Sequence, residues 1–532
     1  MQQGAEAGHP PLSGVSLALL TVALPLATFM QVLDTTIANV AVPTIAGNLG
    51  ASTTQGTWVI TSYSVANAIS LPITGPLARR LGEVRLFLLS AGLFALTSLL
   101  CGLSTSLGML VAFRVLQGAV SGPMLSLAQS LLIVNYPQSK KNMAIALWGM
   151  TVSIAPILGP LLGGWISDNV HWGWIFFINV PVGVVVVVVC WALLKDRESR
   201  RSAQPMSRVG LVLLVLGVGA LQIMLDRGKE LDWFNSTEIL VLGITAVVSL
   251  AFLIVFETTD AHPVVDLKLF TQRNFTIGVV CISLGMMIFM GTVVLLPLLL
   301  QSQYAYTATL AGLAAAPIGV LQLPMAPIVG KNMGRVDLRV LATLGFGIFA
   351  ACMYTRSWFS PMMDIEFVMI PQFFQGIAHA LFFAPLTALA FSRLKPHQMA
   401  GAAGLFNCVR VLFAAIGTSV YTTLWERREA LHHTRLTERV DIFSPYVRER
   451  LEGLQSLGMD ALQSSGYVAG KVTQQSFIIA ANELYWLSAV GFLLLVGVVW
   501  FADGRRGGAG GPGGPGGPGG GGGPGHGPGR GR

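Results

Sequence analysis

Fourteen long apolar segments constrain the fold of this chain more than any other feature. A helix that crosses about 30 Å of hydrocarbon needs about 20 mostly apolar residues. Charged residues make up only 11% of the 532 residues, too few to cover several soluble cores. Lipid is therefore the expected solvent, and the sequence predicts an all-α membrane protein. The expected spans are 15–42, 57–78, 86–104, 107–131, 143–166, 173–194, 208–226, 238–257, 274–300, 309–330, 338–355, 366–391, 401–424 and 480–502.

The positive charges predict the orientation of the spans, because cytoplasmic loops carry an excess of Lys and Arg. Seventeen Lys and Arg residues fall in one set of loops, whereas the opposite short loops hold only Arg227, Lys229 and Arg356. Both termini are then expected in the cytoplasm, which agrees with an even number of spans. The net charge of +8 therefore reflects membrane topology, and nucleic-acid binding is not expected.

An internal repeat suggests two related halves. Gln117-Gly118 and Gln375-Gly376 lie 258 residues apart, and each span is followed by a Pro-containing basic loop and a Gly/Ala-rich helix. This arrangement is typical of transporters whose halves are related by an axis along the membrane normal, although chance similarity of apolar helices is the alternative. The expected regions are a cytoplasmic N-terminus (1–14), an N-terminal six-helix half (15–194), an inserted helix pair (208–257), a C-terminal six-helix half (274–502) with a periplasmic loop at 425–479, and a disordered Gly/Pro-rich cytoplasmic tail (504–532).

One acid lies deep within a span. Asp34 falls in the first span, where a charge costs several kcal/mol, and we expect it to carry the coupling proton. A structural acid held by Thr35, Thr36 or Asn39 is the alternative. Arg114 in the fourth span could pair with Asp34 or help to release its proton, and a static structural pair is the alternative for both residues.

Other polar side chains in the spans are candidates for a substrate cavity. Arg410, beside Asn407, could bind a substrate anion or satisfy carbonyls at a helix end, and His379 could titrate or simply pack between helices. Arg114 and Arg410 outnumber Asp34, which favours neutral or weakly acidic substrates over lipophilic cations. The cavity candidates are Gln31, Asn39, Gln117, Gln375, His379, Asn407 and Arg410.

Glycine and proline mark the fifth span. Small residues let two helices approach closely, and proline bends a helix, so this span suits an interface that must rock. The positions are Gly149, Pro156, Gly159, Pro160, Gly163 and Gly164.

No catalytic or metal-binding residues are expected. The five cysteines lie far apart inside apolar segments, without the spacing of metal ligands. A Ser/His/Asp set and a phosphate-cradling loop are not found either. A membrane enzyme is therefore disfavoured.

These motifs resemble the major facilitator superfamily, and within it the fourteen-span drug:proton antiporters of the EmrB type. In the loop before the third span, Arg79 stands where the superfamily usually has Asp, and Glu83 where it has a base. The matching stretches are Leu33–Pro43, Gly75–Glu83 with gating residues Gly75, Arg79, Arg80 and Gly82, Arg114–Gly118, Gly149–Gly164 and Leu225–Trp233.

The resemblance implies two pseudo-symmetric six-helix halves plus two inserted helices, fourteen transmembrane helices in all. It further implies proton-coupled efflux of small hydrophobic drugs across the bacterial inner membrane, with Asp34 and Arg114 in proton transfer and the proton gradient in place of a cofactor. Such pumps work with a periplasmic membrane-fusion adaptor (EmrA-like) and an outer-membrane channel (TolC-like). A dedicated exporter of one endogenous metabolite, such as a siderophore or lipid, and a non-transporting membrane scaffold are the alternatives.

Overall fold

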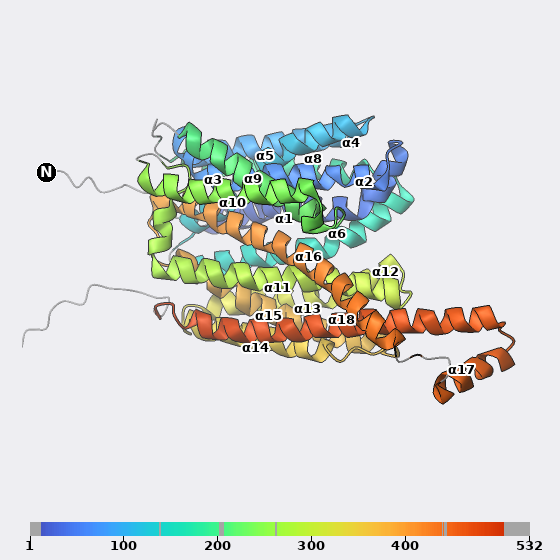
Figure 1. Ribbon diagram of the computed structural model, residues 1–532. Helices are drawn as coiled ribbons and strands as arrows, with labels where there is room; N and C mark the ends of the chain where they lie inside the picture. Colours follow the sequence, from blue (N-terminus) through green and yellow to red (C-terminus); the bar gives the residue numbers. More distant parts are fainter. Residues whose placement is uncertain are drawn as a thin grey trace, which may run out of the picture.

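The computed structural model describes residues 12–137, 140–199, 201, 207–260, 263–438, 440 and 444–504. Within these residues it is a bundle of long helices without strands, as expected (Figure 1). The helices are α1 (Gly14–Asn48), α2 (Thr53–Gly56), α3 (Trp58–Leu81), α4 (Glu83–Gly102), α5 (Leu107–Asn135), α6 (Lys141–Asn169), α7 (Trp174–Phe177), α8 (Asn179–Leu194), α9 (Arg208–Arg227), α10 (Thr237–Thr259), α11 (Arg273–Gln303), α12 (Ala308–Ala315), α13 (Pro317–Asn332), α14 (Leu338–Arg356), α15 (Ile365–Phe391), α16 (Met399–Thr437), α17 (Pro445–Ser456) and α18 (Ala461–Val499), with short 3₁₀ turns at Trp233–Asn235, Leu267–Thr271 and Pro396–Gln398.

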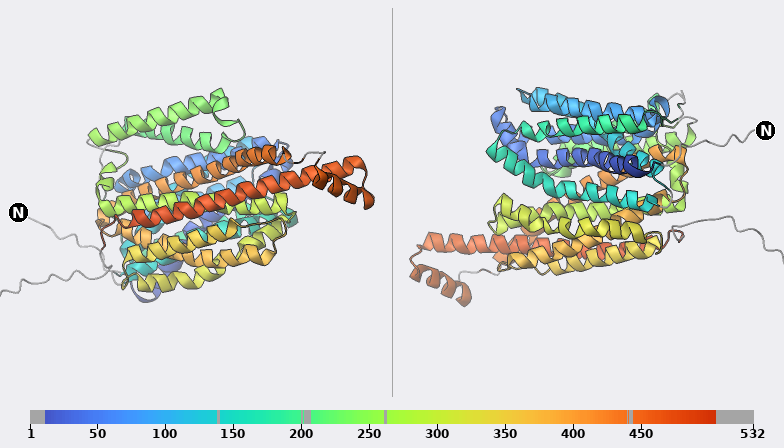
Figure 2. Two further views of the ribbon diagram at one scale, coloured as in Figure 1. Left: turned by 60° about the horizontal axis from the view of Figure 1, so that its bottom comes forward. Right: turned by 180° about the vertical axis from the view of Figure 1, so that it is seen from behind.

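The helices pack as two groups with a pair beside them. In the first group α1 packs against α5, α6 and α8, and α3 and α4 pack against α5. In the second, α11 packs against α15, α16 and α18, and α14 against α15 and α18. The pair α9 and α10 lies at the edge of the bundle, where α9 contacts both α3 and α16 (Figure 2).

Twelve helices in the described residues are long and apolar enough to cross a membrane. The fifth and second expected spans, α6 and α3, are not among these twelve, although they are helices of 29 and 24 residues inside the bundle. The chain is therefore a multi-pass membrane protein with the expected helix order, and the count of fourteen spans stays a prediction.

Several basic loops gather at one end of the bundle, which we call the basic end. Asp503, just after α18, pairs with Arg273 at 3.4 Å and with Arg393 at 2.8 Å. At the same end of the first group, the Glu198 carboxylate accepts the backbone N–H of Val84 at 3.1 Å. The opposite end, from which α17 and the start of α18 project, is the far end (Figure 1).

The segment 425–479 is mostly helical, which differs from the expected loop. Helix α16 continues to Thr437, α17 follows, and α18 begins at Ala461. Helix α17 and the start of α18 project beyond the bundle at the far end (Figures 1 and 2). The indole N–H of Trp425 donates to the Phe477 carbonyl at 3.0 Å and ties α16 to α18. Asp460 caps α18 by accepting the Gln463 N–H at 2.7 Å. The polar composition that suggested a loop instead reflects solvated helices.

Candidate functional site

Asp34 lies on α1 and is fully buried where α1 packs against α5 and α8. Arg114 of α5 donates from Nη1 to Asp34 Oδ2 at 2.5 Å. The other carboxylate oxygen accepts Gln117 Nε2 at 3.1 Å and Asn179 Nδ2 at 2.8 Å. Ser98 Oγ accepts from Gln117 at 2.6 Å and joins α4 to the network. We call these five residues the Asp34 cluster.

The hydroxyl groups beside Asp34 do not cap it. Thr35 donates to the Gln31 carbonyl at 3.1 Å, and Thr36 donates to the Val32 carbonyl at 3.1 Å. Asn39 is exposed rather than turned toward the carboxylate. The alternative in which these neighbours hold a structural acid is therefore wrong, since the donors come from other helices.

Arg114 has acceptors that do not depend on Asp34. Its Nε donates to the Val59 carbonyl at 3.0 Å, and Nη1 also donates to Gln117 Oε1 at 2.8 Å. The guanidinium carbon lies 4.1 Å from the centroid of the Tyr63 ring, within cation–π distance. The cluster can therefore keep Arg114 in place when the charge on Asp34 changes.

The glycines of α6 press against α1 directly beside this cluster. A Cβ on Gly159 would lie 2.1 Å from Thr36 Oγ1, and one on Gly163 would lie 2.9 Å from the Ile37 carbonyl. Gly164 has no heavy atom within 4 Å of such a Cβ, so only part of the expected motif forms the contact. Pro156 is half-buried, and the side chain of Pro160 lies outside the described part of the chain.

The two groups of helices close on each other toward the basic end. A Cβ on Gly75 of α3 would lie 2.8 Å from the Gly401 Cα of α16, and one on Gly330 of α13 would lie 3.0 Å from the Ala146 Cβ of α6. Deeper in the bundle, Gly149 of α6 abuts the Phe383 ring of α15.

In the expected gating loop, Gly75 approaches the other half through Gly401. Gly82 has a φ of +94°, and Glu198 occupies the space of its missing Cβ. Arg79 and Arg80 are exposed.

Most of the remaining cavity candidates are buried between helices. Asn407 of α16 donates to Gln129 Oε1 of α5 at 2.9 Å, a contact between the two groups. Arg410 donates to Asn407 Oδ1 at 3.1 Å and lies 5.8 Å from the Phe383 ring centroid. Arg410 lies inside α16, and both interpretations of its role, substrate binding and the satisfaction of helix-end carbonyls, stay predictions.

The rings and amides near this contact pack closely. The His379 ring stacks on Phe383 with centroids 5.7 Å apart, and its Nδ1 lies 3.4 Å from Gln322 Nε2. Gln31 donates to the Tyr63 hydroxyl at 3.2 Å. Gln31 therefore lies in the first group, whereas Asn407 lies at the contact between the groups.

The sequence analysis placed Arg356 in a short loop, and the structure places it inside a helix instead. It is 1% exposed, ends α14 and donates from Nη2 to Gln375 Oε1. The charge arithmetic based on two buried bases is therefore wrong, since Arg356 is a third. Gln375, expected in the cavity, serves this arginine inside the second group.

The sequence analysis did not identify three polar residues that belong to the Asp34 cluster or contact it. Ser98, Tyr63 and Asn179 are polar residues in apolar spans, and each contacts the cluster from a different helix. Asn179 in particular follows the apolar run Trp174–Ile178 and was detectable as an isolated amide.

Comparison with known proteins agrees with this geometry. A family model described as Major Facilitator Superfamily matches residues 24–418. The chain is 56% identical over 505 residues to the multidrug export protein EmrB of Escherichia coli (strain K12), covering 94% of this chain and 99% of the relative. It is 52% identical to the fatty acid resistance protein FarB of Neisseria gonorrhoeae, covering 93% and 97%.

Solved structures match in fold alone. The human organic anion transporter MFSD10 (TETRAN) superposes with a TM-score of 0.58 at 12% identity, covering 91% of this chain and 99% of that chain. The proton:xylose symporter XylE gives 0.57 at 12% identity, covering 93% and 97%. The resemblance seen in the sequence motifs is thus confirmed: this chain belongs to the Major Facilitator Superfamily, a family of transporters rather than enzymes, and within it to the EmrB-type multidrug export proteins.

Proposed function

We propose that this protein is a proton-coupled antiporter that exports hydrophobic, neutral or weakly acidic compounds across the bacterial inner membrane. The observation that carries the proposal is the Asp34 cluster. It places one buried carboxyl beside the α1–α6 contact, where Gly159 and Gly163 let two helices of the first group touch. Export of drugs is the activity in the name of EmrB, the relative at 56% identity.

Coupling would run through the charge on Asp34. When Asp34 is ionised, Arg114 and two amides hold it. When it takes a proton, Arg114 keeps the Val59 carbonyl, Gln117 and the Tyr63 ring. Proton binding thus changes the attraction between α1 and α5 without expelling the arginine, and α1 would transmit that change to α6. No cofactor is required, since the proton gradient supplies the energy.

The substrate would bind where the two groups meet. Arg410 is buried there, and its hydrogen-bond acceptor among the described residues is the neutral amide of Asn407. A guanidinium without a carboxylate favours an acidic or neutral ligand, since a cation would be repelled in this low-dielectric setting. The stacked rings of His379 and Phe383 offer apolar surface beside it. The name of FarB, fatty acid resistance protein, supports an acidic amphiphile.

The remaining proposals concern the domains of the protein, its orientation in the membrane and its partner proteins. The N-terminal half would comprise 15–194, the inserted pair 208–257, and the C-terminal half 274–502. The excess of Lys and Arg at the basic end supports cytoplasmic termini. The helical segment 425–479 would then be periplasmic and would receive an EmrA-like adaptor that leads to a TolC-like channel.

Reconstituted vesicles test the central claim. Asp34→Asn keeps the shape of the side chain and removes its titration, so we expect substrate binding to persist and pH-driven efflux to fall at least tenfold. Glu366→Gln, an exposed carboxyl in the first turn of α15, is the matched control and should export normally. Near-normal pH-driven efflux by Asp34→Asn would remove this residue from the mechanism.

A dedicated exporter of one lipid-like metabolite is the second candidate, and the FarB name favours it. A panel of unrelated drugs separates the two functions, because a dedicated exporter would protect against one chemical class only.

A further inference from the structure

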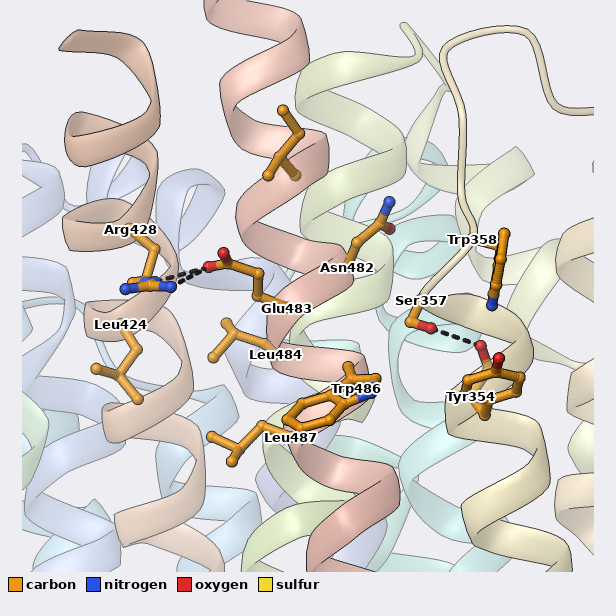
Figure 3. Close-up of a pocket in the computed structure, with 11 residues that line it drawn as sticks. Tyr354, Ser357, Trp358, Leu424, Arg428, Asn482, Glu483, Leu484, Trp486 and Leu487 are labelled. Atoms are coloured by element: carbon orange, nitrogen blue, oxygen red, sulfur yellow. Dashed lines mark hydrogen bonds and ion pairs between the residues drawn. The ribbon is translucent and has the colours of Figure 1, made fainter. Parts of the chain in front are cut away.

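Glu483 and Asp34 both bond to an arginine of a neighbouring helix, but the surroundings of the two pairs differ. Glu483 pairs with Arg428 at 2.7 Å on the wall of an open groove of about 800 Å³, and both side chains are partly exposed (Figure 3). The side chains of Asp34 and Arg114 are only 0% and 1% exposed. A proton on Asp34 therefore depends on neighbouring side chains for its hydrogen-bond acceptor.

The hydrogen bonds that the structure gives Asp34 all come from donors. Oδ2 accepts Arg114 Nη1, and Oδ1 accepts Gln117 Nε2 at 3.1 Å and Asn179 Nδ2 at 2.8 Å. A carboxylate ion accepts hydrogen bonds, whereas a neutral carboxyl must also donate one. Among the described residues, this arrangement fits the ionised form, and a protonated Asp34 needs one neighbour to become an acceptor.

Two of the three donors are fixed. A guanidinium has no acceptor, so Arg114 cannot receive the proton, and Oδ1 is the oxygen of Asp34 on which the proton fits. Gln117 is held in its orientation because its Oε1 accepts Arg114 Nη1 at 2.8 Å while its Nε2 donates to Ser98 Oγ at 2.6 Å. Turning this amide would place its NH₂ group against the guanidinium, which is a contact between two donors.

Asn179 is the donor whose amide can turn. Its Nδ2 lies 2.8 Å from Asp34 Oδ1 and 3.3 Å from Ser98 Oγ, so a turned amide places its own oxygen at hydrogen-bond distance from both. The Ser98 hydroxyl can donate as well as accept. Both neighbours therefore stay bonded whichever way the amide points, and the direction of the two bonds follows the proton on Asp34.

The packing of α8 keeps Asn179 at this point. Asn179 is the first residue of α8 and is 2% exposed. Gly183 lies one turn later on the same face, and it lets α8 approach α4 closely, because a Cβ there would lie 2.6 Å from the Ala95 Cβ. The amide therefore needs only a rotation about its own side-chain bonds to reverse its hydrogen bonds.

The other helices around Asp34 bring no second carboxyl. In the described part of the chain, Arg114 of α5, Tyr63 of α3 and Cys101 of α4 are the charged or titratable groups that face Asp34. Helices α2, α7 and α8 contain no Asp, Glu, Lys, Arg or His, and α6 meets α1 beside Asp34 through Gly159. A carboxyl signal that responds to changes at this point therefore belongs to Asp34.

We propose that Asn179 is a positioning residue that follows the protonation of Asp34: it donates to the ionised carboxylate and, after its amide turns, accepts the proton of the neutral carboxyl. This inference rests on the proposed function in taking Asp34 as the group that carries the coupling proton. It gives α8 a part in coupling, because the same side chain of α8 holds Asp34 in both forms.

Infrared titration of the full chain in lipid nanodiscs tests this role without a proton gradient. The carbonyl band of protonated Asp34 is the band that Asp34→Asn lacks, and its intensity across a series of pH values gives the titration midpoint. Asn179→Leu neither donates nor accepts. It should lower the midpoint by at least about half a pH unit, because the neutral carboxyl loses its acceptor while the ionised form keeps Arg114 and Gln117. Asn169→Leu, at an exposed amide that ends α6, is the matched control and should titrate as the parent does.

The direction of the shift decides between the two roles of Asn179. An amide that only donates would stabilise the ionised form alone, so Asn179→Leu would then raise the midpoint. A raised or unchanged midpoint overturns the proposal. If this variant does not fold, Asn179→Val removes the same groups and must lower the midpoint. Failure of the proposed function is seen separately in vesicles: normal export by Asp34→Asn refutes coupling through Asp34 and leaves the infrared result intact.

Discussion

The ion pair between Asp34 and Arg114 should show a large coupling energy in a double-mutant cycle. Arg114→Gln leaves Asp34 buried with two amide donors, Gln117 and Asn179, as its remaining support. Removing one partner of a buried ion pair costs about 3–5 kcal/mol of folding stability. Because Gln117 and Asn179 would still donate to Asp34, we expect a loss near the lower value. Asp34→Asn should cost less, about 2 kcal/mol, because Arg114 retains the Val59 carbonyl and the Tyr63 ring.

The double variant removes both charges and should recover part of the loss. We expect a coupling energy of about 2 kcal/mol, which corresponds to about a 30-fold change in the unfolding equilibrium. The measurement is the free energy of unfolding of the purified protein in mixed micelles, for the parent, both single variants and the double variant. If the two single effects add to within about 0.5 kcal/mol, the two side chains do not interact as the structure shows and the reasoning is refuted.

Three further predictions follow from helix contacts. Gly159→Ala should destabilise the protein by about 1–3 kcal/mol and reduce export, because its Cβ would lie 2.1 Å from Thr36 Oγ1. Gly164→Ala is the control: its Cβ would have no heavy atom within 4 Å, so its melting temperature and its export should match those of the parent. Gly75→Ala should increase thiol labelling of a cysteine placed on the face of α3 that packs against α16, because its Cβ would lie 2.8 Å from the Gly401 Cα and force the two helices apart. Gly401→Ala, whose Cβ would lie 4.0 Å from the Gly75 Cα, should leave the labelling unchanged. Equal labelling of the two variants would contradict the closed contact. Asp503→Asn should lower the free energy of unfolding by no more than about 1 kcal/mol, since its ion pairs with Arg273 and Arg393 are largely exposed to solvent. A larger loss in thermal melts would contradict the treatment of these pairs as ordinary surface salt bridges.

Periodicity and hydropathy were sufficient to predict the helices, because the bilayer demands long apolar segments whatever the packing. The same physics identified Asp34 and Arg114, since an intramembrane charge is too costly to be incidental. Motif spacing also identified Gly159 and Gly163, which the structure places against α1. These features depend on local composition, which a single sequence displays directly.

Contacts between distant helices were not predictable in the same way. Asn179 reaches Asp34 across 145 residues, and nothing local in the sequence shows which face of α8 turns inward. Arg356 was misplaced because a charge at the end of an apolar segment is compatible with either a loop or a buried helix end. The continuation of α16 to Thr437 was missed because hydropathy reports lipid contact and not helix length. In each case the deciding factor is a tertiary neighbour.

The burial of Arg356 strengthens the case for acidic substrates. Asp34 and Arg114 neutralise each other. Arg410 and Arg356 are left as buried guanidinium groups whose hydrogen-bond acceptors, among the described residues, are the neutral amides of Asn407 and Gln375. A lipophilic cation moving through this protein would be repelled by both groups, because charge repulsion is strong where water is excluded. An acidic amphiphile would instead supply the missing counter-charge at each. The placement of these two arginines, and not the net charge of the chain, therefore favours carboxylates and phenolates over quaternary ammonium compounds.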